Sequence, residues 1–197
     1  RKANDFDLEY FKQRMAQDNL RFANEKEDLL ELFAIAEQKK WTWYETYVLA
    51  RETAVSQVIS IKRMKQKLAQ KPAEGQFSKQ EQSIIQEAKQ TSPMVFLAEI
   101  KKTRQAAITR TERKLLLDLA ELGLLDEVIN VILLLTFNKV DSANLNEKYA
   151  LKVANDFSYQ KVTTAEEAVL KIRERNQQPQ NRPAKSGQGS TKSNVPD

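Results

Sequence analysis

The chain has 197 residues, of which 30% are charged and 41% hydrophobic, and its formal net charge is +5. It contains no Cys and no His, which excludes disulfides, thiolate or imidazole metal sites, cysteine nucleophiles and histidine acid–base chemistry. Only four Gly and five Pro occur, too few turn formers for a many-stranded β fold. The composition predicts an all-α protein with a packed core.

The chain begins at Arg1 rather than Met, and we expect it to be a fragment of a longer protein. Its most apolar stretch, residues 128–137, is interrupted by Asn130. That stretch is much shorter than the roughly 18 residues that a membrane-spanning helix needs. We therefore expect any membrane association to be indirect.

Helix starts can be read from the capping residues in chain order. Asp7 is predicted to cap the first helix, with Phe6 and Phe11 forming a hydrophobic staple. Capping-box spacings then occur at Asn24/Glu27, Thr42/Glu45, Ser78/Glu81, Thr109/Glu112, Asn144/Glu147 and Thr163/Glu166. Pro93 suits a first helical position and Gly123 a helix end. These signals predict about nine helices.

Apolar residues between these signals repeat at helical spacing. One such series, which predicts a helix beyond residue 53, contains Tyr44, Tyr47, Val48, Val55, Val58 and Ile59. Another contains Leu115, Leu116, Leu119 and Leu122. Both are typical of helices that pack one face against a core.

The best internal boundary is residues 71–77, which contain Pro72 and Gly75. This linker separates two tandem helical modules, residues 1–70 and 78–175. A shift of 86 residues aligns apolar positions of the two, so the first is interpreted as a degenerate copy of the second. Residues 176–197 have no aromatic side chain, and this polar tail is expected to be disordered.

Two short stretches hold most of the excess positive charge. Residues 51–71 and residues 100–115 each contain six basic residues and one acidic residue, a net charge of +5 each. Such clusters can neutralise nucleic-acid phosphates. Solvated helix faces, or cations placed at helix C-termini, are the alternative interpretation.

The second module carries three motifs in a distinctive order. Residues 124–133 read Leu-Leu-Asp-Glu-Val-Ile-Asn-Val-Ile-Leu, followed by Tyr149-x3-Val153-x3-Phe157 and by Lys-Val-Thr-Thr-Ala-Glu-Glu-Ala at 161–168. Over residues 90–175 this pattern resembles the DnaD/DnaB family of replication initiation proteins of Gram-positive bacteria. The family pattern is Tyr-x3-Ile-x3-Trp, so Val153 and Phe157 keep the bulk but remove the indole donor.

The resemblance implies a non-enzymatic role in replication initiation or restart. It implies binding to single-stranded DNA, self-association into a homo-oligomer such as a tetramer, and help in loading the replicative helicase. The implied partners are the other primosome proteins: the initiator, a DnaD-type protein, the helicase loader and the helicase. Family members carry an N-terminal winged-helix domain, which we expect to be absent here, so that the chain resembles the C-terminal part of a two-module member. No cofactor is implied, and the expected location is the cytoplasm, at the nucleoid.

Exposed aromatic and basic side chains together suit single strands, because rings stack on bases and cations follow the backbone. The predicted DNA-binding residues are Tyr149, Lys152, Val153, Phe157, Tyr159, Lys161, Lys171, Arg173, Arg175, Lys62, Arg63, Lys65, Lys101, Lys102 and Arg104. At i, i+4 and i+8 spacing, Val153 and Phe157 are interpreted first as core residues.

A dense aromatic cluster contains Trp41, Trp43, Tyr44 and Tyr47. A hydrophobic cluster at a helix start is favoured over a base-stacking platform, because Tyr44 and Tyr47 share a helix face.

The acidic pairs Asp118/Glu121 and Asp126/Glu127 are the only candidates for a hard-cation site. No phosphate-binding glycine loop or nucleophile motif accompanies them, so neither catalysis nor a metal site is expected. A second hypothesis for function is a purely protein-binding helical scaffold without direct nucleic-acid contact.

Overall fold

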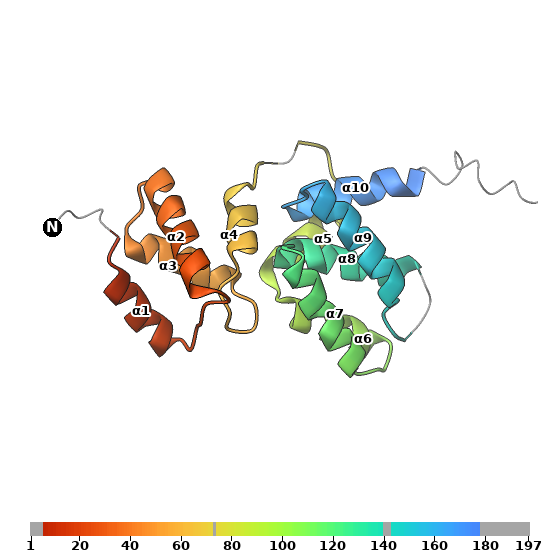
Figure 1. The fold of residues 1–197 in the computed structure, drawn as a ribbon. Coiled ribbons are helices and arrows are strands. Elements are labelled where there is room, and N and C mark those ends of the chain that lie inside the picture. The colour runs from red at the N-terminus through yellow and green to blue at the C-terminus, as the bar shows by residue number, and fades with distance from the viewer. Residues whose placement is uncertain (1–5, 73, 140–142, 178–197) are drawn as a thin grey trace, which may run out of the picture.

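The computed structural model describes residues 6–72, 74–139 and 143–177 (Figure 1). These ranges contain ten helices and no strand, which confirms the all-α prediction. The helices are α1 (Leu8–Gln17), α2 (Glu25–Lys39), α3 (Trp43–Thr53), α4 (Ile61–Leu68), α5 (Lys79–Gln90), α6 (Pro93–Thr103), α7 (Arg110–Glu121), α8 (Asp126–Lys139), α9 (Glu147–Tyr159) and α10 (Ala165–Gln177).

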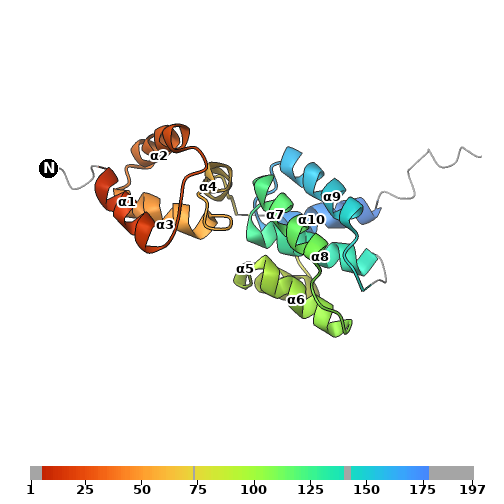
Figure 2. The same cartoon turned by 60° about the horizontal axis from the view of Figure 1, so that its bottom comes forward.

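The helices form two modules, each with its own hydrophobic core. Helices α1–α4 pack around Phe11, Leu32, Tyr47, Ile59 and Met64. In the second module α8 is central, since it packs against α5, α6, α7, α9 and α10. Both views of the ribbon place α4 on the side of the first module that faces the second (Figures 1 and 2).

The described helix starts largely follow the capping signals. Asp7, Asn24, Thr42, Ser78 and Thr109 all accept hydrogen bonds from backbone amides of the first turn that follows them. The rings of the predicted staple, Phe6 and Phe11, lie 5.3 Å apart between centroids.

Two predicted caps are displaced. Helix α9 is capped by Asn146 rather than Asn144, since the Asn146 side chain accepts from the Tyr149 amide. At α10 it is Thr164 whose hydroxyl accepts, from the Glu167 amide.

Residues 54–59 differ from the predicted continuous helix. Helix α3 ends at Thr53, and Val55 and Val58 then exchange two backbone hydrogen bonds of 2.9 Å, closing a two-residue hairpin. Both residues of its turn, Ser56 and Gln57, have positive φ, as a type I′ turn requires. Arg21 bonds to the same segment, through Gln57 O and Ile59 N. The helical interpretation of Val55 and Val58 is therefore wrong.

Polar side chains connect the two modules. Arg63 of α4 donates to Asp126, at the start of α8, over 2.6 Å. Beyond α4, Gln70 donates to the Thr163 carbonyl over 2.8 Å and to Glu127 over 3.2 Å. These contacts place the basic helix α4 beside the segment that joins α9 to α10.

Helices α1–α4 of the first module and helices α6–α9 of the second have the same order and a similar packing. A shift of about 86 residues places α1–α4 on α6–α9, and in both sets the third helix packs against the other three. The copy interpretation of residues 1–70 stays a prediction.

The last described helix extends into the segment that was predicted to be a polar tail. Helix α10 continues to Gln177, so Asn176 and Gln177 are helical rather than part of a tail, and residues 178–197 lie outside the described residues.

None of the described helices combines the length and apolar character that crossing a membrane requires.

Candidate nucleic-acid interface

Helix α9 separates a buried face from an exposed basic face. Val153 and Phe157 point into the second core, while Lys148, Lys152 and Tyr159 lie on the exposed side. Positions 148, 152 and 159 share one face of a helix because they follow the i, i+4, i+11 spacing. Tyr159 is 88% exposed, so its ring is available to a ligand.

The C-terminal end of α9 and Lys62 of the first module lie beside the same turn, which follows α7. Lys161 ends the helix in a left-handed conformation, with φ of 56°, and is exposed. Ser158 Oγ donates to the Leu122 carbonyl over 3.4 Å, and a Cβ built on Gly123 would lie 3.4 Å from the Cβ of Lys62. The turn that follows α7 thus has the end of α9 on one side and exposed Lys62 on the other.

We call the exposed residues on α9, on its terminal turn and on the adjoining face of α4 the lysine strip. Its members are Lys62, Lys148, Lys152, Tyr159 and Lys161. Lys148 was not predicted from the sequence, although its spacing of four residues from Lys152 was visible there.

The charge of the lysine strip is not cancelled by close partners. Within the described ranges, none of its four lysines lies in an ion pair. Of the two acids on α9, Asp156 is paired with Arg175 at 2.8 Å, and Glu147 occupies the first turn, where it complements the helix dipole. The lysine strip therefore offers four lysines outside any ion pair of the described residues, together with one exposed ring.

The two hydrophobic motif residues are buried in the second core. Val153 is 0% and Phe157 1% exposed, because both fill the space between α9 and the rest of the second core. Their core interpretation is confirmed, and in this structure neither side chain is exposed to a DNA ligand. Tyr149 is half-buried and packs against the same core.

Two of the predicted cations are buried as well. Lys101 is fully buried and donates to Glu112 (2.9 Å), to the Ala143 carbonyl (2.7 Å) and to Asn144 (3.0 Å). Arg63 has a side chain only 5% exposed and is held by Asp126. Lys101 and Arg63 therefore lie inside the fold, away from the exposed surface on which a DNA contact was predicted.

The Glu112 carboxylate is stabilised despite its burial. Burial by itself raises the pKa of Glu112, but hydrogen bonds from the backbone amides of Leu145 and Thr109 and from Lys101 lower this pKa below its usual range overall. The Glu112 carboxylate that pairs with Lys101 therefore stays ionised at neutral pH despite its burial.

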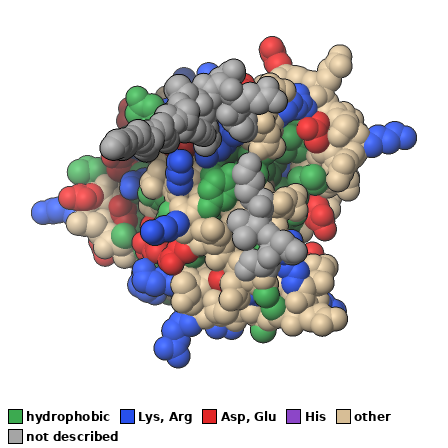
Figure 3. Space-filling view, turned by 90° about the vertical axis from the view of Figure 1, so that its right-hand side faces the viewer, with side chains coloured by type: hydrophobic (Ala, Val, Ile, Leu, Met, Phe, Trp, Pro, Cys, Tyr) green, Lys and Arg blue, Asp and Glu red, His purple; other side chains and the backbone are tan. Residues whose placement is uncertain are grey.

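The remaining predicted cations are dispersed and mostly paired. Lys65 pairs with Glu31, Arg104 lies over the ring of Phe137, and Arg173 pairs with Glu81. Lys102 is exposed and Lys171 half-buried. Viewed from the end of the second module, Lys and Arg side chains are interspersed with acidic and hydrophobic ones (Figure 3). Several cations of the two stretches are thus buried or paired, so the excess charge of the sequence is not all exposed.

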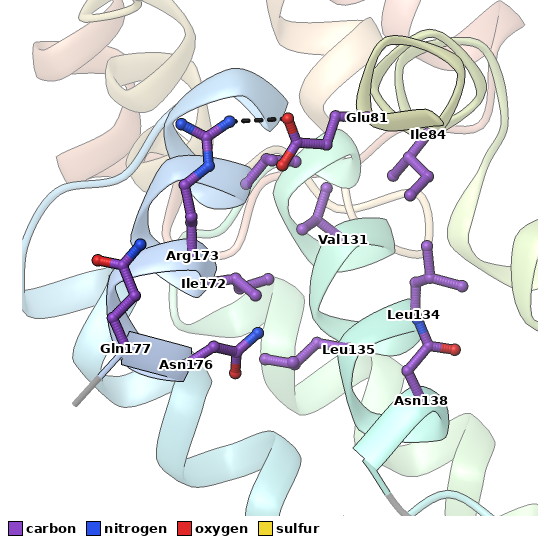
Figure 4. A pocket seen from close by; sticks show the side chains of 11 residues that line it. Glu81, Ile84, Val131, Leu134, Leu135, Asn138, Ile172, Arg173, Asn176 and Gln177 are labelled. Carbon is purple, nitrogen blue, oxygen red and sulfur yellow. Dashed lines mark hydrogen bonds and ion pairs between the residues drawn. The ribbon is translucent and has the colours of Figure 1, made fainter. Parts of the chain in front are cut away.

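An apolar groove of about 620 Å³ runs between α5, α8 and α10 (Figure 4). Val131, Leu134 and Ile172 line it. At one end Arg173 donates to Glu81 over 2.7 Å, so the charges at the groove cancel each other. The backbone amide of Ser78 and then Arg173 lower the pKa of Glu81, which keeps this pair ionised.

The acidic pairs singled out in the sequence have structural partners. Asp118 pairs with Lys114, and Asp126 with Arg63. Glu127 accepts a hydrogen bond of 2.8 Å from the Ala165 amide, at the start of α10. In the part of the chain that the structure describes, no three metal-ligating side chains gather at one point.

Comparison with known protein families gives two matches. Residues 1–71 match the model of the DnaB N-terminal winged helix domain, and residues 97–172 match the family described as replication initiation and membrane attachment. Together the matches cover about three quarters of the chain. Neither the curated proteins nor the solved structures gave a match.

These domains define a replication initiation protein. The chain belongs to the DnaD/DnaB family, as the motifs of the second module predicted. The expected absence of the winged-helix domain is wrong, since residues 1–71 match it. Its helix-turn-helix consists of α2 and α3 with a three-residue turn, and the minimal hairpin at 55–58 stands in the place of a wing.

Proposed function

We propose that this protein binds single-stranded DNA with little sequence preference and contributes in this way to loading the replicative helicase. The lysine strip is the observation that carries the proposal. Its unpaired lysines suit a phosphate backbone, and the exposed ring of Tyr159 suits stacking on a base. Sequence is read from the edges of the bases, whereas lysines on phosphates and a ring stacked on a base bind every sequence alike. Binding by the lysine strip should therefore show little sequence preference.

The role proposed here is binding and assembly, without catalysis. Three of the four acids singled out in the sequence, Asp118, Asp126 and Glu127, are engaged in capping or ion pairs, and the sequence has no His or Cys. The proposed setting is the cytoplasm at the nucleoid, with an initiator, a DnaD-type protein, a helicase loader and the helicase as partners. We further propose a homo-oligomer such as a tetramer. Light scattering that gives a monomer at micromolar concentration would contradict this last point for the chain described here.

A protein-binding scaffold is the second candidate, and the groove between α5, α8 and α10 favours it. The groove is apolar along its floor and its one ion pair is internal, so it offers no free charge to a phosphate. Such a surface suits an apolar segment of another protein.

A labelled oligo(dT) and fluorescence anisotropy separate the two candidates. The wild-type chain should bind at low salt, and a variant with Lys62, Lys152 and Lys161 changed to Gln should bind at least tenfold more weakly. A control with Lys12, Lys26 and Lys79 changed to Gln loses the same charge on other helices and should bind nearly as well as the wild type. No binding at low salt favours the scaffold, and equal losses in both variants would contradict the lysine strip as the DNA site.

A further inference from the structure

A row of aromatic rings, two of them exposed, lies on α1 and α3 of the first module, two helices that carry no residue of the lysine strip. Tyr10 of α1 stacks on Trp43 of α3, with 5.8 Å between ring centroids, and Trp43 meets Tyr44 edge-on at 5.6 Å. Tyr10 is 54% and Tyr44 47% exposed. The Arg14 guanidinium lies 5.8 Å from the centroid of the Tyr44 ring. We call Tyr10, Trp43, Tyr44 and Arg14 the aromatic ledge.

The core does not need the outer rings of the ledge. Tyr47, one turn after Trp43, is 1% exposed, meets Phe11 edge-on at 5.3 Å and donates its hydroxyl hydrogen bond to Asp18. Burial and the hydrogen bond to Asp18 raise the pKa of this hydroxyl. In the aromatic cluster predicted from the sequence, Tyr47 is buried, as a hydrophobic cluster requires. Tyr44 is exposed, and packing in the core does not account for its ring.

The charges around the ledge favour an anionic ligand. Lys39 and Lys40 end α2 just before the turn into α3, and both are exposed without an ion pair among the described residues. Two of the acids near the ledge, Glu45 and Asp18, are engaged in the fold. Glu45 accepts the Thr42 amide over 2.9 Å in a capping box, and Asp18 lies within 4 Å of both Arg14 and Arg51.

We propose that the aromatic ledge is a second binding site for single-stranded DNA. Unpaired bases would stack on Tyr44 and Tyr10, while Arg14, Lys39 and Lys40 face the phosphates. Exposed rings with neighbouring cations are the combination that binds single strands without reading their sequence. This inference rests on the proposed function, to which it adds a site on α1 and α3, away from the residues of the lysine strip.

Intrinsic tryptophan fluorescence can report on binding at the aromatic ledge, because the tryptophans of the chain lie in it or next to it. The two tryptophans of the chain are Trp41 and Trp43, so intrinsic tryptophan fluorescence reports on the ledge and not on the lysine strip. Trp41→Phe leaves Trp43, within the ledge, as the single reporter. Unlabelled oligo(dT) should quench the Trp43 emission over the same concentration range in which the anisotropy of a labelled oligo(dT) rises.

Three variants test the stacking itself. Tyr44→Leu keeps an apolar side chain but removes the ring, and should weaken oligo(dT) binding by about 5- to 100-fold. Tyr44→Phe keeps the ring and should bind nearly as the wild type does. Leu30→Ala changes a side chain that is 68% exposed on α2 and should have no effect on binding. Melting curves identify any variant that has lost its fold.

The outcomes distinguish this proposal from the proposed function. If the anisotropy rises but Trp43 is not quenched and Tyr44→Leu binds normally, the ledge is not a DNA site, although DNA binding itself stands. If the anisotropy never rises, the proposed function fails and the ledge proposal fails with it. A change of oligomeric state in Tyr44→Leu, with unchanged affinity for oligo(dT), would instead assign the ledge to a protein contact and overturn the proposal.

Discussion

The ammonium of Lys101 lies 2.9 Å from the carboxylate of Glu112, and both side chains are almost completely buried. The pair also holds the segment that precedes α9, because Lys101 donates to the Ala143 carbonyl and Glu112 accepts from the Leu145 amide at 2.7 Å. Since α9 carries most of the lysine strip, this buried pair positions the start of the candidate interface without contacting a ligand.

Removing one partner of this pair should destabilise the second module. Lys101→Met leaves a buried carboxylate without its cation, and such losses cost about 3–5 kcal/mol. Urea unfolding followed by circular dichroism measures the change. Lys102→Met is the matched control, since Lys102 is exposed next in the chain and should change the free energy of unfolding by less than about 0.5 kcal/mol. Equal effects would contradict a structural role for Lys101.

The Lys101–Glu112 ion pair should make the stability of the folded chain depend on pH in the acidic range. The pKa of Glu112 is lower in the folded chain than its ordinary value of 4.5. The stabilisation from its ionised form is therefore present above pH 4.5 and is lost as the pH falls through the folded-state pKa. Melting temperatures recorded between about pH 6 and pH 3 should fall less steeply for Glu112→Gln than for the wild type. Parallel curves would show that Glu112 does not contribute.

Phe157 and Tyr159 lie two residues apart, but their replacement by Ala should have opposite effects on stability and on oligo(dT) binding. Phe157→Ala removes a buried ring and should cost about 3–5 kcal/mol of stability, while the molecules that remain folded still bind oligo(dT). Tyr159→Ala should leave the free energy of unfolding within about 0.5 kcal/mol, because the ring is exposed. It should weaken oligo(dT) binding by about 5- to 100-fold. The reverse pattern would place Phe157, and not Tyr159, at the DNA.

Removing the last segment tests a further electrostatic contribution. Deletion of residues 178–197 removes three cations, Arg182, Lys185 and Lys192. If they contact phosphates, the slope of log K against log salt should become smaller by up to about 2, at roughly 0.7 for each contact. The melting temperature is expected to stay nearly unchanged, since the segment has few apolar side chains to bury. An unchanged slope would exclude these cations from binding.

Local signals predicted the helices well but not the hairpin after α3. Capping residues such as Thr42 and Thr109 act within one turn, so their effect can be read from neighbouring positions. Type I′ hairpin turns usually carry Asn or Gly, because both central residues need positive φ. Here Ser56 and Gln57 occupy the turn, and the contact with Arg21 that supports it joins residues distant in sequence.

The candidate site was predictable only in part, because charge in a sequence does not reveal burial. Lys101 and Lys102 are neighbours with the same charge, yet one is fully buried and the other exposed. The distinction depends on Glu112 and the segment at Ala143, which fold around Lys101 from other helices. In the same way, Tyr10 joined the aromatic cluster only when α1 packed against α3.

The salt dependence of oligo(dT) binding by the lysine-strip variant tests the central claim most directly. Each phosphate contacted on a single strand contributes about −0.7 to the slope of log K against log salt. With Lys62, Lys152 and Lys161 changed to Gln, the slope should become smaller by up to about 2, while the Lys12, Lys26 and Lys79 control keeps the wild-type slope. A wild-type slope near zero, or the same slope in all three proteins, would contradict phosphate binding by the lysine strip.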